Sequence, residues 1–78
     1  MRVLLFAALA EALGRRELSV EADPAPATAG ELESHLRECW PELRGRPFRV
    51  AVNQRYARAE DPVAEPDEIA LIPPVSGG

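Results

Sequence analysis

The sequence predicts an α+β fold, a mixed β-sheet with one main helix packed on one of its faces. Short apolar or alternating segments, which are typical of strands, recur along the chain. One longer segment instead has helical spacing and begins with a helix-capping signal. The length of 78 residues allows one domain and leaves little room for an internal cleft. We therefore expect a carrier, an adaptor or a subunit rather than an enzyme that works alone.

The first three elements follow directly from the pattern of side chains. Residues 2–7 are apolar at nearly every position, which favours a buried central strand; as a secretory signal the apolar run would be short. Residues 8–14 predict a short helix, which Gly14 ends because glycine readily adopts the left-handed conformation. Residues 16–22 alternate between apolar and polar side chains and predict a half-buried strand.

The main helix follows a proline-rich connection. Thr28 and Glu31 stand three residues apart and form a capping box at its start. Leu32, Leu36 and Trp40 then recur at near-helical spacing, so this helix has one apolar side.

Two side chains of this helix are candidates for chemistry. His35 has no visible partner for metal binding or catalysis, so we expect a plain surface histidine. Cys39 is the only cysteine, and we expect it to pack at the helix end as a small hydrophobic residue. One cysteine cannot close an internal disulfide or build a thiolate metal site, and it fits a reducing cytoplasm. We therefore predict no metal site and a cytoplasmic location.

The sequence of the second half of the chain predicts strands and turns. Residues 48–53 alternate and predict a strand. Asn53 and Gln54 suit the turn that follows, and Tyr56 begins a short return strand. In "EPDE" we expect a type I turn with Pro66 at its second position, where the fixed φ of proline is suitable. The last strand, "EIALIP", is again apolar on both faces.

The first and last strands are the most apolar, so we expect them to pair in parallel at the centre of the sheet. With one helix across one face, this arrangement is a β-grasp, or ubiquitin-like roll. We predict a β-grasp domain over residues 1–74 and a flexible tail over residues 75–78 that ends in Gly-Gly.

One helix covers one face of a sheet, yet the two central strands carry apolar residues on both. The residues that alternate away from the helix are expected to form an exposed apolar patch. These candidate partner-binding residues are Leu4, Phe6, Ala70 and Ile72.

The end of the chain suggests a chemical role. Pro73 and Pro74 lack backbone donors and hold the chain extended, so the exit from the domain is stiff. Val75, Ser76, Gly77 and Gly78 continue this tail. Glycines without a Cβ can pass through a narrow channel and carry the carboxylate into the active site of another protein. ATP would convert that carboxylate to an acyl-adenylate, and a sulfur nucleophile would then leave a terminal thiocarboxylate.

Composition excludes other classes. The net charge of −4 argues against a nucleic-acid groove, which needs clustered positive charge. The opening apolar run is too short to span a membrane, so no membrane partner is expected. All nine basic residues are arginines, and without lysine there is no Schiff-base chemistry in this chain.

Three segments, "VLLFAALAEALG", "VAVNQRYA" and "DEIALIPPVSGG", resemble the small subunit of molybdopterin synthase, the MoaD-type sulfur carrier of the ubiquitin-like ThiS superfamily. The resemblance covers essentially the whole chain, and "PPVSGG" is its most specific part. This family usually has glycine in "DGDE", where this chain has "EPDE".

The resemblance implies a defined chemistry. Gly78 would be adenylated by a ubiquitin-activating-like enzyme with Mg·ATP, so that the chain carries a nucleotide at that step, and then converted to a thiocarboxylate. The sulfur would pass to cyclic pyranopterin monophosphate and form the molybdopterin dithiolene that holds molybdenum. The large subunit would supply the catalytic groups, in a heterotetramer of two small and two large subunits. Phe6 and Ile72 would contact it, and this chain would bind no cofactor of its own.

The sequence is also compatible with other functions. The chain could carry sulfur for thiamin thiazole or for tRNA thiolation. It could also be a ubiquitin-like modifier that joins Gly78 to lysines of other proteins, or an interaction domain whose tail has no chemistry.

Overall fold

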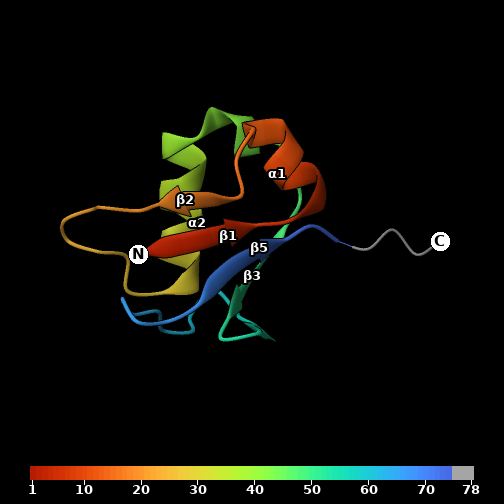
Figure 1. Cartoon of the computed structure of the whole chain (residues 1–78). Helices are drawn as coiled ribbons and strands as arrows, with labels where there is room; N and C mark the ends of the chain where they lie inside the picture. Colours follow the sequence, from red (N-terminus) through yellow and green to blue (C-terminus); the bar gives the residue numbers. More distant parts are fainter. Residues whose placement is uncertain (75–78) are drawn as a thin grey trace.

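The computed structural model describes residues 1–74 and contains one five-stranded mixed sheet with the main helix across one face (Figure 1). The elements in chain order are β1 (Arg2–Leu5), α1 (Ala7–Leu13), β2 (Glu17–Ser19), α2 (Ala29–Cys39), the 3₁₀ turn η1 (Pro41–Leu43), β3 (Arg49–Val52), β4 (Arg55–Tyr56) and β5 (Ile69–Ile72). The strand order is β2-β1-β5-β3-β4. β1 and β5 pair in parallel at the centre, and the other pairs are antiparallel. This confirms the predicted β-grasp arrangement.

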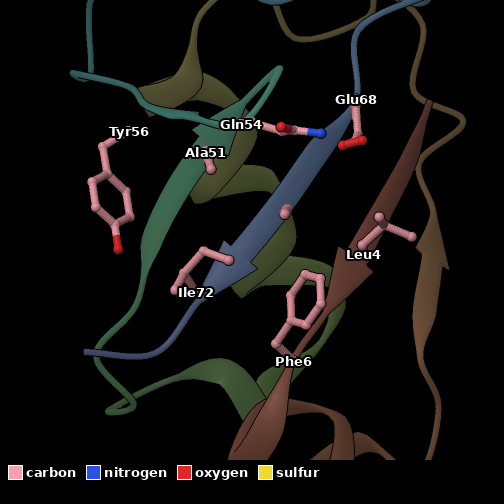
Figure 2. A pocket seen from close by; sticks show the side chains of 8 residues that line it. Leu4, Phe6, Ala51, Gln54, Tyr56, Glu68 and Ile72 are labelled. Atoms are coloured by element: carbon pink, nitrogen blue, oxygen red, sulfur yellow. The ribbon is translucent and has the colours of Figure 1, made fainter. Parts of the chain in front are cut away.

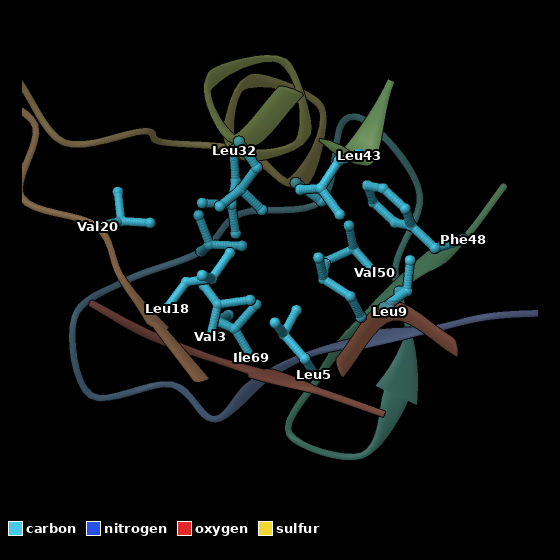
Figure 3. Close-up of a cluster of buried hydrophobic side chains, with 14 residues drawn as sticks. Val3, Leu5, Leu9, Leu18, Val20, Leu32, Leu43, Phe48, Val50 and Ile69 are labelled. Atoms are coloured by element: carbon cyan, nitrogen blue, oxygen red, sulfur yellow. The ribbon is translucent and has the colours of Figure 1, made fainter. Parts of the chain in front are cut away.

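The core lies between the sheet and α2 (Figure 3). Alternate residues of the central strands, Val3 and Leu5 in β1 and Ile69 and Leu71 in β5, are buried against the helix. Leu32 and Leu36 of α2 pack against them and are equally inaccessible. Full burial of such a side chain contributes roughly 1.5–3 kcal/mol, so this layer supplies most of the stabilisation.

The start of α2 confirms the predicted capping box. The backbone N–H of Glu31 donates to Thr28 Oγ1 at 3.2 Å. Glu31 Oε1 in turn accepts from the backbone N–H of Ala27 at 3.2 Å, one residue before the usual partner. Gly30 N–H donates to the carbonyl of Ala59 at 2.9 Å, so a loop distant in sequence fixes the first turn of the helix.

Several predicted boundaries were wrong. The first strand ends at Leu5 rather than at residue 7, because Ala7 has a φ of +50° and begins α1. Gly14 does end α1 in the left-handed conformation, with a φ of +69°. The main helix ends at Cys39, ahead of Pro41, which cannot donate a helical hydrogen bond.

The strands are also shorter than predicted, and one turn was placed wrongly. β2, β3 and β5 each omit residues at their predicted ends. The turn near Pro66 runs from Ala64 to Asp67, since the N–H of Asp67 donates to the carbonyl of Ala64 at 3.0 Å. Pro66 is therefore its third residue, not its second. Asp67 Oδ2 also accepts from the N–H of Ala64 at 2.8 Å and holds the turn in this register.

The predicted turn at Asn53 and Gln54 is confirmed and has an unusual backbone. Both residues are left-handed, with φ values of +52° and +67°. Asn53 is tied down by its side chain, which accepts from the N–H of Glu68 and donates to Asp67 Oδ1, each at 3.0 Å. This turn therefore holds the β3–β4 hairpin against the residues that lead into β5.

Candidate apolar docking groove

The face of the sheet opposite α2 carries the predicted patch. The side chains of Leu4, in β1, and of Phe6, directly after β1, lie on this face. Their neighbours Val3 and Leu5 are buried on the opposite face, against α2. Ala70 and Ile72 of β5 alternate in the same way. The predicted division of the two strands into a core side and an open side is therefore confirmed.

These side chains line a shallow groove of about 480 Å³ (Figure 2). The residues around it are Leu4, Phe6, Ala51, Gln54, Tyr56, Glu68, Ala70 and Ile72. We call this surface the docking groove. Strand register explains its shape, because Ala70 lies beside Leu4 in β1 and beside Ala51 in β3. Two adjacent alanines thus form a low floor between larger side chains.

Exposed aromatic surface is concentrated at this groove. Among residues 1–74, the large hydrophobic side chains classed as exposed are Phe6, at 47%, and Tyr56, at 54%, and both line it. Aromatic residues half open to water are frequent anchors in protein interfaces. An apolar groove with aromatic walls is therefore suited to docking a protein surface.

The groove lies next to the place where the chain leaves the sheet. Ile72 lines the groove and is also the last residue of β5. Pro73 and Pro74 follow it; they cannot donate to a neighbouring strand, so the sheet cannot continue along them. A protein docked in the groove would therefore meet the chain at its exit. The predicted tail residues, Val75, Ser76, Gly77 and Gly78, lie outside the described residues.

The polar side chains at the groove lie at its two ends. Gln54 and Glu68 stand together at the end where β5 begins (Figure 2). At the other end Arg49, the first residue of β3, pairs with Ile72 across the sheet. Its guanidinium carbon lies 4.2 Å from the centre of the Tyr56 ring, a cation–π contact.

The sequence predicted four of the eight residues that line the groove and did not predict Ala51, Gln54, Tyr56 and Glu68. Ala51 could have been placed on the open side, because it alternates with the buried Val50. Tyr56 and Gln54 depend on the register of the hairpin, in which Tyr56 pairs with Ala51. No local pattern gives that register. Glu68 follows from the alternation of β5 once Ile69 is placed in the core.

The two candidates for chemistry on α2, His35 and Cys39, do not line the docking groove. His35 is half-buried on α2, and its Nε2 is 3.4 Å from the sulfur of Cys39. Cys39 is at the helix end as predicted, but it is exposed rather than packed, because the chain turns away at Pro41. Within residues 1–74, no cluster of three side chains of the metal-binding types was found. In the same part of the chain, none of the helices has the length and apolar character needed to cross a bilayer.

The sheet order defines a ubiquitin-like β-grasp protein, in which the docking groove lies beside the exit of the last strand. The sequence profile of the ThiS family matches residues 3–78. The chain therefore belongs to the ThiS family.

Two curated relatives and a solved structure are similar to this chain over nearly its whole length. The molybdopterin synthase sulfur carrier subunit of Dictyostelium discoideum is 35% identical, over 99% of this chain and 94% of the relative. Small archaeal modifier protein 1 of Haloferax volcanii is 38% identical, over 95% of each chain. A crystal structure of SAMP1 from that organism superposes with a TM-score of 0.81 at 34% identity, covering 99% of this chain and 97% of that one.

A second solved structure is a protein–protein complex of subunits 1 and 2 of the molybdopterin-converting factor from Helicobacter pylori. The match covers 99% of this chain and 96% of one chain of the complex, with 25% sequence identity and a TM-score of 0.67.

Proposed function

We propose that this chain is the sulfur carrier subunit of molybdopterin synthase. The observation that carries the proposal is the docking groove, which ends at Ile72, where the chain leaves the sheet. The similarity to a molybdopterin synthase sulfur carrier subunit, which extends over nearly the whole length of both chains, supports the proposal. A similar chain in a complex of two molybdopterin-converting subunits supports a large-subunit partner.

The proposed chemistry takes place at the carboxylate of Gly78. A ubiquitin-activating-like enzyme joins this carboxylate to AMP from Mg·ATP and releases pyrophosphate. A sulfur nucleophile then attacks the acyl carbon, AMP leaves, and a thiocarboxylate remains. Unlike an amide, this group is ionised and nucleophilic at neutral pH. It gives its sulfur to cyclic pyranopterin monophosphate, and two carriers supply the two dithiolene sulfurs of molybdopterin.

The division of labour follows from the size of the chain. A domain of 78 residues has little room for a cleft that surrounds a substrate. In the proposal the large subunit supplies the catalytic groups, and a heterotetramer holds two copies of each subunit. The carrier supplies the docking groove, with Phe6 and Ile72 as apolar anchors, and a slender end with the sulfur. A reducing cytoplasm suits a chain with the single, exposed Cys39.

A ubiquitin-like modifier is the second candidate, and the similarity to small archaeal modifier protein 1 favours it specifically. The same activated carboxylate would then be attacked by the amine of a lysine on another protein, forming an isopeptide. This chain contains no lysine, so it cannot be conjugated to its own side chains. Carriers for thiamin thiazole or tRNA thiolation share the activation step and differ in the acceptor.

Intact mass spectrometry tests the proposal. The chain is incubated with Mg·ATP, an activating enzyme and a sulfur donor, and we expect the mass change of one oxygen replaced by sulfur. A variant lacking Gly78 serves as the control and should not change. Addition of the large subunit and cyclic pyranopterin monophosphate should then return the mass to that of the carboxylate as molybdopterin forms.

Two other results would contradict the sulfur carrier of molybdopterin synthase. A terminus that stays a carboxylate with every activating enzyme tried would exclude sulfur chemistry. A thiocarboxylate that persists with the large subunit, yet is consumed with a tRNA or thiazole acceptor, would assign the sulfur to another product. Conjugates with lysines of other proteins would instead establish the modifier function.

A further inference from the structure

Arg49 occupies a defined position at the edge of the docking groove. It precedes the buried Val50, so its side chain leaves β3 on the open side of the sheet. Its strand register places it directly beside Ile72. The ring of Tyr56, which lines the groove, supports its guanidinium at 4.2 Å. Arg49 is therefore a cation at the exit end of the groove, beside the last residue of β5.

The charge of Arg49 is not neutralised by the residues that the structure describes. Another arginine on the open side, Arg2, pairs with Glu17 through Nε and Oε2 at 3.1 Å. Arg37 on α2 pairs with Glu33 at 3.1 Å. For Arg49 no carboxylate among residues 1–74 lies within ion-pair distance; its contact there is the Tyr56 ring. The ring limits the positions of the guanidinium, which lowers the entropy lost when a further partner binds it.

The two ends of the groove have opposite charge. Glu68 stands at the end where β5 begins, and Arg49 at the end where β5 stops. Arg16 adds positive charge at the exit end, since it borders the hollow on the other side of Phe6. The chain as a whole carries a net charge of −4. The exit end is thus locally positive on an acidic protein.

We infer that Arg49 selects the orientation of the large subunit by binding a carboxylate on that subunit, beside the opening that receives the tail. This inference rests on the proposed function and adds the chemistry of the partner surface. That surface carries an apolar ridge that fills the groove, with an acidic side chain opposite Arg49. A docked partner turned end for end would bring its acidic group to Glu68 instead, which like-charge repulsion disfavours. Only the correct orientation leads the tail into the active site.

Association kinetics with the large subunit from the same source test this inference. Charges at the edge of an interface act mainly on the association rate and its dependence on salt. We expect Arg49→Glu to slow association about tenfold at low ionic strength, with the difference shrinking toward roughly twofold when salt screens the charge. Arg55→Glu is the matched control. It makes the same charge change in the neighbouring strand β4. Arg55 pairs with Val52, which packs against the core, so Arg55 lies on the helix side of the sheet and not on the side of the docking groove.

A second pair of variants tests the support from the aromatic ring. Tyr56→Phe retains the ring beside Arg49 and is the variant against which loss of the ring is compared. Tyr56→Leu retains apolar bulk but removes the cation–π contact, and should reduce the salt dependence of association. Circular dichroism of each variant shows whether the fold is intact. A glutamate-to-arginine change on the large subunit that restores binding to Arg49→Glu would identify the acidic partner residue.

The outcomes separate the two proposals. If the parent chain binds the large subunit, and Arg49→Glu and Arg55→Glu associate equally fast at low salt, the role of Arg49 is wrong and the proposed function stands. If the parent chain does not bind the large subunit at all, the proposed function is wrong and the inference fails with it. Slow association of Arg49→Glu alone, reversed by salt, supports both.

Discussion

Replacing Gln54 by glycine should stabilise the protein, even though it removes a side chain from the docking groove. Gln54 has a φ of +67°, where a residue with a Cβ is disfavoured by roughly 1–2 kcal/mol. Glycine relieves this strain but adds freedom to the unfolded chain, which costs about 0.4–1 kcal/mol. The expected net gain in the free energy of unfolding is about 0.5–1 kcal/mol. In a domain of this size it corresponds to a rise in Tm of about 2–8 °C.

The neighbouring residue should respond in the opposite direction. Asn53 also has a positive φ, but asparagine tolerates this conformation better. Its side chain makes hydrogen bonds with the N–H of Glu68 and with Asp67, each at 3.0 Å. Each such bond contributes about 0.5–1.5 kcal/mol net. Asn53→Gly should therefore lower the free energy of unfolding by about 1–2 kcal/mol.

Urea denaturation followed through the fluorescence of Trp40 measures both changes, and the midpoint reports stability when the slope is unchanged. Gln54→Ala is the control, because it truncates the side chain and keeps a Cβ at a positive φ. It should give none of the gain. Equal shifts for Gln54→Gly and Gln54→Ala would refute the argument from strain. A gain in stability with Asn53→Gly would refute the argument from its hydrogen bonds.

Three further predictions concern other parts of the fold. Phe6→Glu should abolish binding to the large subunit while circular dichroism stays unchanged, since Phe6 is 47% exposed; an unfolded variant would instead give Phe6 a structural role. Leu5→Ala, one residue away but 4% exposed, should cost about 2–5 kcal/mol of stability, and an unchanged urea midpoint would contradict the core assignment. Thr28→Ala should cost about 1 kcal/mol by removing the cap of α2, whereas Thr28→Ser should retain most of that stability.

Much of the fold could be predicted because its signals are local. The alternation of β1 and β5 identified Leu4, Phe6, Ala70 and Ile72 as the open side, since side chains in a strand alternate strictly. The capping box placed the start of α2, because its chemistry involves residues three apart.

The rest depends on contacts between distant parts of the chain. The position of Pro66 in its turn follows from the bonds that Asp67 makes, and not from the preference of proline alone. The contributions of Ala51 and Tyr56 to the groove follow from which strand lies beside β5. The contact of Arg49 with Tyr56 likewise requires the hairpin register. Periodicity along one segment carries no information about these pairings.

The parallel pairing of β1 with β5 also has a consequence for protein synthesis. Of the strands that the structure describes, β1 is synthesised first and β5 last, yet the two lie side by side at the centre of the sheet. Pairings between such distant segments form late, because the loop between them must close first. The floor and walls of the groove include residues of both strands, so a chain in which β5 has not yet been made lacks the groove. Binding in this groove therefore requires that β5 has been made and has paired with β1.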